Sequence, residues 1–379
     1  MYNYQKSYRY FAQVADDIKD IAEEELLSLG AKNTHLAYRG IHFTAEKESL
    51  YTINFNSRLI NRVLAPIKTF ACHSDQYLYK TAVKINWSDF LQTTDTFAVF
   101  ATVSHSAIKH SKFAALRLKD AIADSFRENI GQRPSVDTRN PDVWINLHIE
   151  NNEAVISIDT SGGSLHRRGY RRRSVQAPMV ETLAAAIIKY SDWDGNTPLH
   201  DPFCGSGTIL CEAFLKASAT PASFLREKFG FEQLPDFDAK VWQQVKKDSL
   251  EKIVSISENL ITGSDIALQA VKSSTYNSSL IDPKSLIKIV RKDVFEIESL
   301  ENKTIIGNPP YGIRLNNEED LSSFYKNFGD FLKQRCKGST AYIYFGERKY
   351  IKNIGLKASW KKEISNGGLD GRLVKYELY

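Results

Sequence analysis

From Ala177 to its C-terminus, the sequence alternates strand-like apolar runs with glycine-containing loops and helical runs. A strand, a glycine loop and a helix are predicted in TPLHDPFCGSGTILCEAFLKA. One further strand is predicted in each of four later segments, NLITGSDIALQAVKSS, LIKIVRKDVFEI, KTIIGNPPYG and STAYIYF. This alternation is typical of a doubly wound parallel sheet. The tail KKEISNGGLDGRLVKYELY breaks it with two extended runs around Gly367-Gly368, which predict a closing antiparallel hairpin. We therefore expect an α/β domain over residues 177–379.

The residues before this domain predict two smaller α+β units, since 379 residues exceed one ordinary core. Residues 1–65 read as strand, helix, strand in YRYFAQVA, DDIKDIAEEELLSLG and GIHFTA. Residues 66–165 contain a strand (TFAVFATVS), the helix SKFAALRLKDAIADSFREN, and two strands joined by a turn. We expect Phe113 of that helix to face the core. Residues 166–176 read as a basic linker.

Cysteine content and hydropathy exclude several classes of protein. The four cysteines form no CxxC pair, so neither a zinc ribbon nor a disulfide framework is indicated. None of the eight histidines has the spacing of metal ligands or of a catalytic triad, and we expect no metal. No run approaches the eighteen or so apolar residues of a membrane span, and the N-terminus lacks a signal pattern. The sequence therefore predicts a cytoplasmic protein.

Positive charge is concentrated in two places, although the net charge is only +5. HRRGYRRR holds five arginines in eight residues, and residues 331–379 carry eleven Lys/Arg against four Asp/Glu. Each patch alone is compatible with a solvated surface, but two patches around one domain favour a polyanionic partner. For Lys112, on a predicted helix, solvent exposure and RNA contact are equally compatible. The candidate RNA-binding residues are Lys112, Arg167, Arg168, Arg171, Arg172 and Arg173.

HDPFCGSGTIL places a G-x-G turn between a strand and a helix, which lets a ligand approach the backbone and the free N–H groups of the helix. Alone, this turn is weak evidence. No Gly-Lys-Ser/Thr follows, so it is not a Walker loop, and Leu210 replaces the third glycine of a dinucleotide fingerprint. The turn thus predicts a ligand without a polyphosphate.

Two later strands end in Asp265 and Asp293. The carboxyl ends of parallel strands border the ligand crevice, where carboxylates can accept ribose hydroxyls or an adenine amino group. The alternative is that each acid caps the following helix. Because Asp201, Gly205, Gly207, Asp265 and Asp293 recur at successive strand ends, they favour a nucleoside-containing cofactor. S-adenosylmethionine is the leading candidate, since its sulfonium cation suits a site with acids and no phosphate-binding lysine.

IIGNPPYG forms a rigid corner after another strand. An exocyclic amino group of a base is a poor nucleophile because its lone pair is delocalised into the ring. The Asn308 side-chain carbonyl and the Pro309 backbone carbonyl, fixed by Pro310, can accept its two hydrogens, and Tyr311 can stack on a flipped base. The alternative is a structural turn. We expect Asn308, Pro309, Pro310 and Tyr311 to be catalytic.

DPFCGSGT, GNPPYG and the preceding helix APMVETLAAAII together resemble the class I amino-methyltransferases. LHRRGYR and the N-terminal half resemble the THUMP-containing RNA guanine-N2 methyltransferases, specifically the N-terminal half of RlmL and its single-module YpsC-like relatives. The resemblance implies a ferredoxin-like domain at 1–65, a THUMP RNA-binding domain at 66–165 and a Rossmann-like methyltransferase domain at 177–379. It also implies one methylation, not two.

The resemblance also implies site roles. Asp201, Gly205 and Gly207 would line the methionine part of the cofactor, Asp265 would bind its ribose, and Asp293 would lie by its adenine. Asp265 follows the glycine loop by nearly sixty residues, so its strand context and not its spacing supports this role. The full set expected to bind the cofactor is Pro178, Glu181, Thr182, Asp201, Phe203, Gly205, Gly207, Thr208, Asp265, Asp293 and Asn308.

The leading functional hypothesis is formation of N2-methylguanosine in large-subunit (23S) rRNA. Methylation of a tRNA guanosine stays open. DNA adenine-N6 methylation uses the same corner, but the N-terminal half shows no helix-turn-helix pattern. Methylation of a protein glutamine would leave HRRGYRRR without an evident partner. A non-enzymatic ribosome-assembly factor would not need Asn308, Gly205 and Gly207. The oligomeric state is left open.

Overall fold

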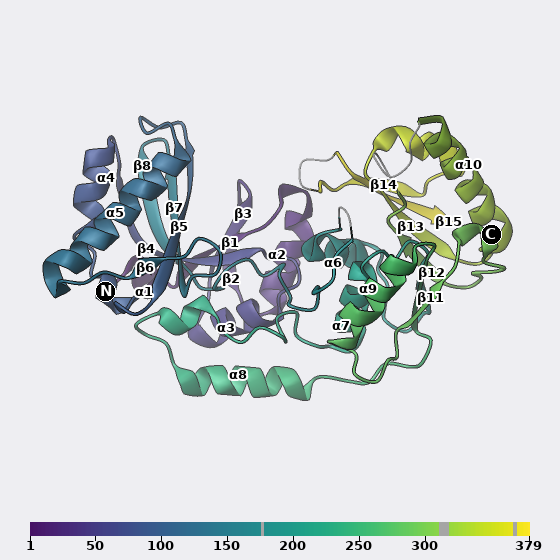
Figure 1. Cartoon of the computed structure of the whole chain (residues 1–379), viewed down its shortest axis with the longest axis horizontal. Coiled ribbons are helices and arrows are strands. Elements are labelled where there is room, and N and C mark those ends of the chain that lie inside the picture. Colours follow the sequence, from purple (N-terminus) through teal and green to yellow (C-terminus); the bar gives the residue numbers. More distant parts are fainter. Residues whose placement is uncertain (176–177, 311–317, 367–369) are drawn as a thin grey trace. The chain divides into compact units, whose positions relative to one another are not determined.

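The computed structural model describes residues 1–175, 178–310, 318–366 and 370–379 (Figure 1). The chain forms two compact units. Unit 1 consists of Met1–Leu165 and Arg226–Lys247, and unit 2 consists of His166–Leu225 and Asp248–Tyr379. The chain therefore passes between the units three times, and residues 226–247 do not belong to the domain predicted for 177–379.

Unit 1 is built on one eight-stranded sheet with the order β2-β3-β1-β4-β8-β7-β5-β6. Its pairs are antiparallel, except that β5 runs parallel to both β6 and β7. The predicted boundary at residue 65 falls inside β4, which pairs with β1 on one side and β8 on the other. The strands are β1 (Arg9–Gln13), β2 (Lys32–Ala37), β3 (Gly40–Thr44), β4 (Arg62–Ala71), β5 (Thr96–Ser104), β6 (Ser135–Val136), β7 (Val143–Glu150) and β8 (Glu153–Asp159).

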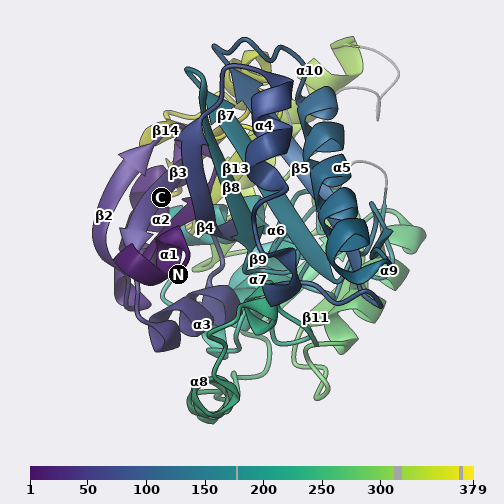
Figure 2. The same ribbon diagram turned by 90° about the vertical axis from the view of Figure 1, so that its left-hand side faces the viewer.

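Helices cover this sheet, and α4 and α5 lie side by side over β5 and β7 (Figures 1 and 2). α5 buries Leu118, Ile122 and Phe126, whereas Phe113 is 49% exposed. The expectation for Phe113 is wrong because it lies five residues before Leu118, about 140° around the helix. The helices are α1 (Asn3–Ser7), α2 (Lys19–Ser28), α3 (Lys47–Asn56), α4 (Asp75–Ala82), α5 (Ser111–Ile130) and the 3₁₀ turns η1 (Asp16–Ile18), η2 (Trp87–Asp89) and η3 (Gly230–Gln233).

The segment 226–247 joins unit 1 through aromatic packing. Phe231 stacks on Tyr51 of α3 with ring centroids 4.4 Å apart, and Trp242 meets Phe55 edge-on at 5.3 Å. The Phe231 N–H donates to the Thr160 carbonyl at 2.8 Å. Trp242 lies in α8 (Ala239–Glu251), which runs across the division between the units. Burial of these rings, which dominates core energetics, explains why the segment belongs to unit 1.

Unit 2 is built on a seven-stranded sheet with the order β11-β10-β9-β12-β13-β15-β14. The first five strands are parallel, and β15 pairs antiparallel with both β13 and β14. The doubly wound sheet and its closing hairpin are therefore confirmed. The strands are β9 (Leu199–Asp201), β10 (Ile261–Asp265), β11 (Lys288–Arg291), β12 (Thr304–Gly307), β13 (Thr340–Phe345), β14 (Trp360–Glu363) and β15 (Arg372–Glu377).

Helices lie on both sides of the unit 2 strands, with α6, α7 and α9 together and α10 apart from them (Figure 1). α10 packs Phe328 and Leu332 into a core cluster with Ile305 of β12, Ile343 of β13 and Val374 of β15. The helices are α6 (Glu181–Tyr190), α7 (Thr208–Ala217), α9 (Leu268–Ser279), α10 (Glu318–Arg335) and the 3₁₀ segments η4 (Val294–Glu296) and η6 (Arg348–Ile354).

Candidate active site

The loop between β9 and α7 contains the two predicted glycines in the left-handed conformation. Gly205 has φ 54° and Gly207 has φ 83°. A Cβ on Gly207 would lie 2.9 Å from the Ser274 Cβ, so a side chain there would push against α9. α7 begins directly afterwards, at Thr208. The glycines thus allow both the turn and the close packing of the loop on α9.

Asp265, at the end of β10, fixes the glycine loop from the neighbouring strand. Its Oδ2 accepts the Gly205 N–H at 2.9 Å, and its Oδ1 accepts the Ala267 N–H at 2.9 Å. The first bond ties the loop to β10, and the second turns the chain into α9. Each oxygen keeps a second lone pair, so the carboxylate could still accept hydroxyl groups of a ligand.

Asp201 ends β9 in a fully buried position, 1% exposed. Its Oδ1 accepts the Phe203 N–H at 2.9 Å. The pKa of the Asp201 carboxyl is raised to about 8, mainly by burial; the Phe203 hydrogen bond lowers it, and the nearby Asp265 carboxylate adds a smaller increase. A buried carboxyl of this kind gains most from a cationic partner.

A small cavity joins the glycine loop to Asn308. At about 30 Å³ it is smaller than a nucleoside and marks only part of a ligand site. Six of the residues expected to bind the cofactor line it, namely Pro178, Asp201, Phe203, Gly205, Thr208 and Asn308. Five other residues line the cavity but were not predicted from the sequence. The positions of Cys204 and Ser206 beside the glycines could have indicated them, whereas no sequence pattern indicates Val175, Met179 or Ile209.

Asn308 follows β12, and its side-chain Oδ1 is buried with no hydrogen-bond donor among the described residues. The turn that follows Asn308 is fixed by the Tyr325 hydroxyl, which donates to the Pro310 carbonyl at 3.1 Å. No described residue donates to the Pro309 carbonyl. Tyr311 lies outside the described residues. An unpaired buried acceptor costs free energy, so Asn308 is suited to a ligand that brings a donor.

The remaining expected cofactor residues do not line this cavity. Glu181 is buried and forms an ion pair with Arg171, while its neighbour Thr182 is buried in α6. Asp293 accepts the Phe295 N–H at 3.0 Å and caps η4, which is the alternative role considered for it. Gly207 and Asp265 do not line the cavity either, and the cofactor role of the whole expected set stays a prediction.

The arginine run divides into buried and exposed members. Arg168 is 2% exposed and pairs with Glu212 of α7, which also accepts the Tyr170 hydroxyl. The expectation that Arg168 contacts RNA is therefore wrong for this conformation, since its guanidinium is enclosed by protein. The side chain of Arg171 is 14% exposed and bound to Glu181, which leaves little of it for RNA. Residues that stay exposed are Arg167, Arg172, Arg173 and, in unit 1, Lys112.

Two absences hold for residues 1–175, 178–310, 318–366 and 370–379. No three His, Cys, Asp or Glu side chains gather there as metal ligands would. None of the helices in those ranges is long and apolar enough to span a bilayer.

The strand order of unit 2, with a glycine loop after β9 and, after β12, a side-chain oxygen that has no described partner, defines a Rossmann-like methyltransferase domain. Residues 168–375 match the family described as "RMKL-like, methyltransferase domain". Residues 9–64 match the "RlmL ferredoxin-like domain", and residues 72–159 match the "THUMP domain". The chain belongs to the RMKL-like methyltransferase family, with RlmL ferredoxin-like and THUMP domains ahead of the catalytic one.

Similar proteins differ in length. The chain is 38% identical to "Putative RNA methyltransferase slr0064" of Synechocystis sp., over 98% of this chain and 97% of that one. It is 33% identical to "Ribosomal RNA large subunit methyltransferase K/L" of Syntrophotalea carbinolica, over 98% of this chain but 53% of that one. It thus spans about half the length of that relative. A solved structure described as "a possible methylase from Clostridium difficile 630" has a TM-score of 0.85 and 26% identity, over 98% of each chain.

Proposed function

We propose that this protein transfers a methyl group from S-adenosylmethionine to the N2 of a guanosine in large-subunit ribosomal RNA. The observation that carries the proposal is the buried, unpaired Oδ1 of Asn308, in the same cavity as Asp201 and the glycine loop. Membership of the RMKL-like methyltransferase family supports the reaction type.

The residues of unit 2 fit the proposed cofactor. S-adenosylmethionine supplies a methyl group on a sulfonium cation and carries an ammonium group. Asp201 offers a buried carboxyl that a cation would stabilise in its charged form, and the free lone pairs of Asp265 suit ribose hydroxyls. Among the described residues that line the cavity there is no lysine or arginine, which suits a cofactor without a polyphosphate.

Asn308 and Pro309 would hold the target amine. The Asn308 Oδ1 and the Pro309 carbonyl each accept one N–H of the exocyclic amino group, which draws the hydrogens aside and aligns the nitrogen for in-line displacement. Pro310 is anchored by Tyr325, so the direction of the corner is set before the base arrives. Tyr311 completes the proposed set as a stacking surface for a flipped base.

Two features support an RNA substrate. Arg167, Arg172 and Arg173 are exposed, and residues 72–159 match the THUMP domain. We assign residues 1–65 to the ferredoxin-like domain, 66–165 to the THUMP domain, 166–176 to the linker and the rest, apart from 226–247, to the methyltransferase domain. Ribosomal RNA is preferred because the K/L relatives are named for it, and a cytoplasmic location fits that substrate.

The test is methylation with tritiated S-adenosylmethionine of purified 23S rRNA, tRNA and DNA, followed by mass spectrometry of nucleosides from each. N2-methylguanosine in the rRNA supports the proposal. N2-methylguanosine in tRNA alone would favour the tRNA alternative. Label confined to DNA adenine or to protein would overturn the proposal.

A further inference from the structure

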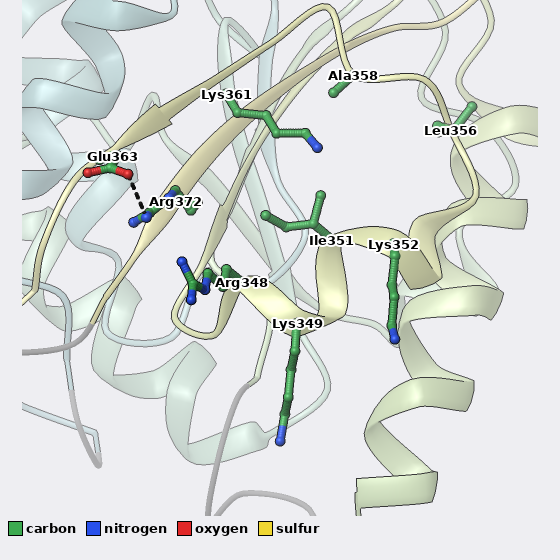
Figure 3. Close-up of a pocket in the computed structure, with 9 residues that line it drawn as sticks. All are labelled: Arg348, Lys349, Ile351, Lys352, Leu356, Ala358, Lys361, Glu363 and Arg372. Atoms are coloured by element: carbon green, nitrogen blue, oxygen red, sulfur yellow. Dashed lines mark hydrogen bonds and ion pairs between the residues drawn. The ribbon is translucent and has the colours of Figure 1, made fainter.

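A basic pocket lies on unit 2 beside the segment that follows β13. Figure 3 shows it between η6 and the β14–β15 hairpin, with Lys361 extending from β14 and Lys352 from η6. The basic pocket is lined by Arg348, Lys349, Ile351, Lys352, Leu356, Ala358, Lys361, Glu363 and Arg372.

Strand register places this pocket near the carboxyl end of β12, where Asn308 lies. Gly307, at the end of β12, pairs with Ile343 of β13. β13 ends at Phe345, which pairs with Arg372, and Arg372 pairs in turn with Glu363 of β14. Three strand spacings separate β12 from β14, which is ~14 Å, or the rise of about four stacked nucleotides. A strand of RNA with one base at Asn308 would thus reach the pocket within a few nucleotides.

The arginines of the pocket form ion pairs with carboxylates of described residues, whereas two of its lysines do not. Arg372 is held by Glu363 at 2.7 Å and also contacts Asp370, and Arg348 faces Asp370 at 3.7 Å. Lys352 and Lys361 are exposed, and no described carboxylate lies within ion-pair distance of either. The arginines therefore brace the hairpin, and the two lysines are available to an anionic partner.

The floor of the pocket is apolar. Ile351, Leu356 and Ala358 pack against the core cluster under η6. The pocket has a volume of about 570 Å³, within the usual range of sites for small organic groups. A cationic rim above an apolar floor matches a nucleotide, whose phosphate is charged and whose sugar and base are less polar.

We propose that the basic pocket receives the RNA backbone adjacent to the target nucleotide, with Lys352 and Lys361 contacting its phosphates. The inference rests on the proposed function, because it assumes that RNA enters the Asn308 site. RNA is favoured over a free small anion for two reasons. The strand register places the pocket near the Asn308 site, and residues 331–379 carry seven excess positive charges.

The test compares Lys352→Ala, Lys361→Ala and the double variant with wild type in binding to 23S rRNA across a salt series, and in steady-state methylation. Each lysine removed should reduce the slope of log K against log salt by about 0.7 to 0.9. The KM for RNA should rise several-fold in the double variant, while the KM for S-adenosylmethionine stays unchanged. The matched control is Lys284→Ala, an exposed lysine before β11 at the opposite edge of the same sheet.

Lysine acetylation in the full-length protein, read by mass spectrometry with and without 23S rRNA, provides a second measurement. RNA should protect Lys352 and Lys361 and leave Lys284 reactive. The pocket assignment is overturned if the Lys352 and Lys361 variants have the same salt slope and the same KM for RNA as Lys284→Ala and if RNA does not protect either lysine from acetylation. The proposed function would not be affected by that result. A wild-type protein that methylates no RNA defeats the proposed function itself, and that result appears before any variant is made.

Discussion

Asn277 of α9 binds Arg173 of the arginine linker through both ends of its side-chain amide. Its Oδ1 accepts the Arg173 N–H at 2.9 Å, and its Nδ2 donates to the Arg173 carbonyl at 2.7 Å. The same Nδ2 donates to the Ser206 carbonyl in the glycine loop at 2.9 Å, and Asn277 is fully buried. One side chain thus links the linker that we expect to meet RNA with the loop that we expect to meet the cofactor.

Replacing Asn277 by Ala should loosen the glycine loop. The change leaves the buried Ser206 carbonyl and the partly buried backbone groups of Arg172 and Arg173 without their amide partner, so the free energy of unfolding should fall by about 1–3 kcal/mol. Affinity for S-adenosylhomocysteine should fall about tenfold, as measured by titration calorimetry. Asn129→Ala is the control, because within the described residues that amide bonds only to the Ser125 carbonyl of its own helix. Unchanged cofactor affinity in Asn277→Ala would remove the proposed coupling.

Arg168 and Arg167 should behave in opposite ways although they are neighbours. Arg168→Ala leaves Glu212 buried without its cation, which should lower the free energy of unfolding by about 3–5 kcal/mol in urea denaturation. Arg167→Ala should change stability by less than about 0.5 kcal/mol and instead reduce the salt dependence of RNA binding. The double change Arg168→Met with Glu212→Gln removes both charges and keeps an acceptor for the Tyr170 hydroxyl, so it should recover part of the lost stability. A stable Arg168→Ala variant with weakened RNA binding would contradict the buried role.

The Asp201 carboxyl predicts a pH-dependent loss of stability in the cofactor-free protein. Its pKa is about 8 in the folded state against an ordinary value of 3.8, so the folded state holds a proton that the unfolded state releases. Stability should therefore fall as pH rises from about 4 to about 8. Asp201→Asn removes this titration and should raise the free energy of unfolding at pH 8 by on the order of 1–4 kcal/mol.

The check on Asp201→Asn is urea unfolding of both proteins at pH 5 and pH 8. The stability gain of the variant should be smaller at pH 5, and its affinity for S-adenosylhomocysteine should be lower at pH 8 because the ammonium loses an anionic partner. Parallel stability curves for the two proteins would show that Asp201 does not titrate in this window.

Asn308→Ala should remove turnover without removing RNA binding. Loss of one positioned acceptor in a buried site costs about two to three orders of magnitude in kcat. RNA affinity should change little, because the exposed arginines and lysines lie elsewhere. Asn308→Asp retains an oxygen acceptor and should keep more activity than Ala. Wild-type kcat in Asn308→Ala, measured with tritiated cofactor, would rule out the proposed role of the amide.

Local patterns predicted the sheet of unit 2 and six of the residues that line the cavity of the candidate site. The alternation of strands and helices, the turn at Gly205 and Gly207, and the position of Asn308 after a strand all follow from neighbouring residues. Long-range partners could not be predicted. Arg168 was expected to contact RNA with the rest of the charged run, because nothing in the local sequence indicates its partner Glu212, 44 residues away. Asp293 at a strand end could equally be a ligand or a cap; the structure shows that it caps η4, and its cofactor role stays a prediction.

The packing of Phe231 on Tyr51 bears on how the chain is synthesised and how its gene could be divided. A nascent chain cannot complete the hydrophobic interior of its amino-terminal half until residue 247 has emerged from the ribosome. By then, β9 and the glycine loop have also been translated. A chimaera joined at Leu165 would lack residues 226–247, which pack on the rings of Tyr51 and Phe55. Recombination that preserves the fold must therefore transfer residues 226–247 together with the amino-terminal half.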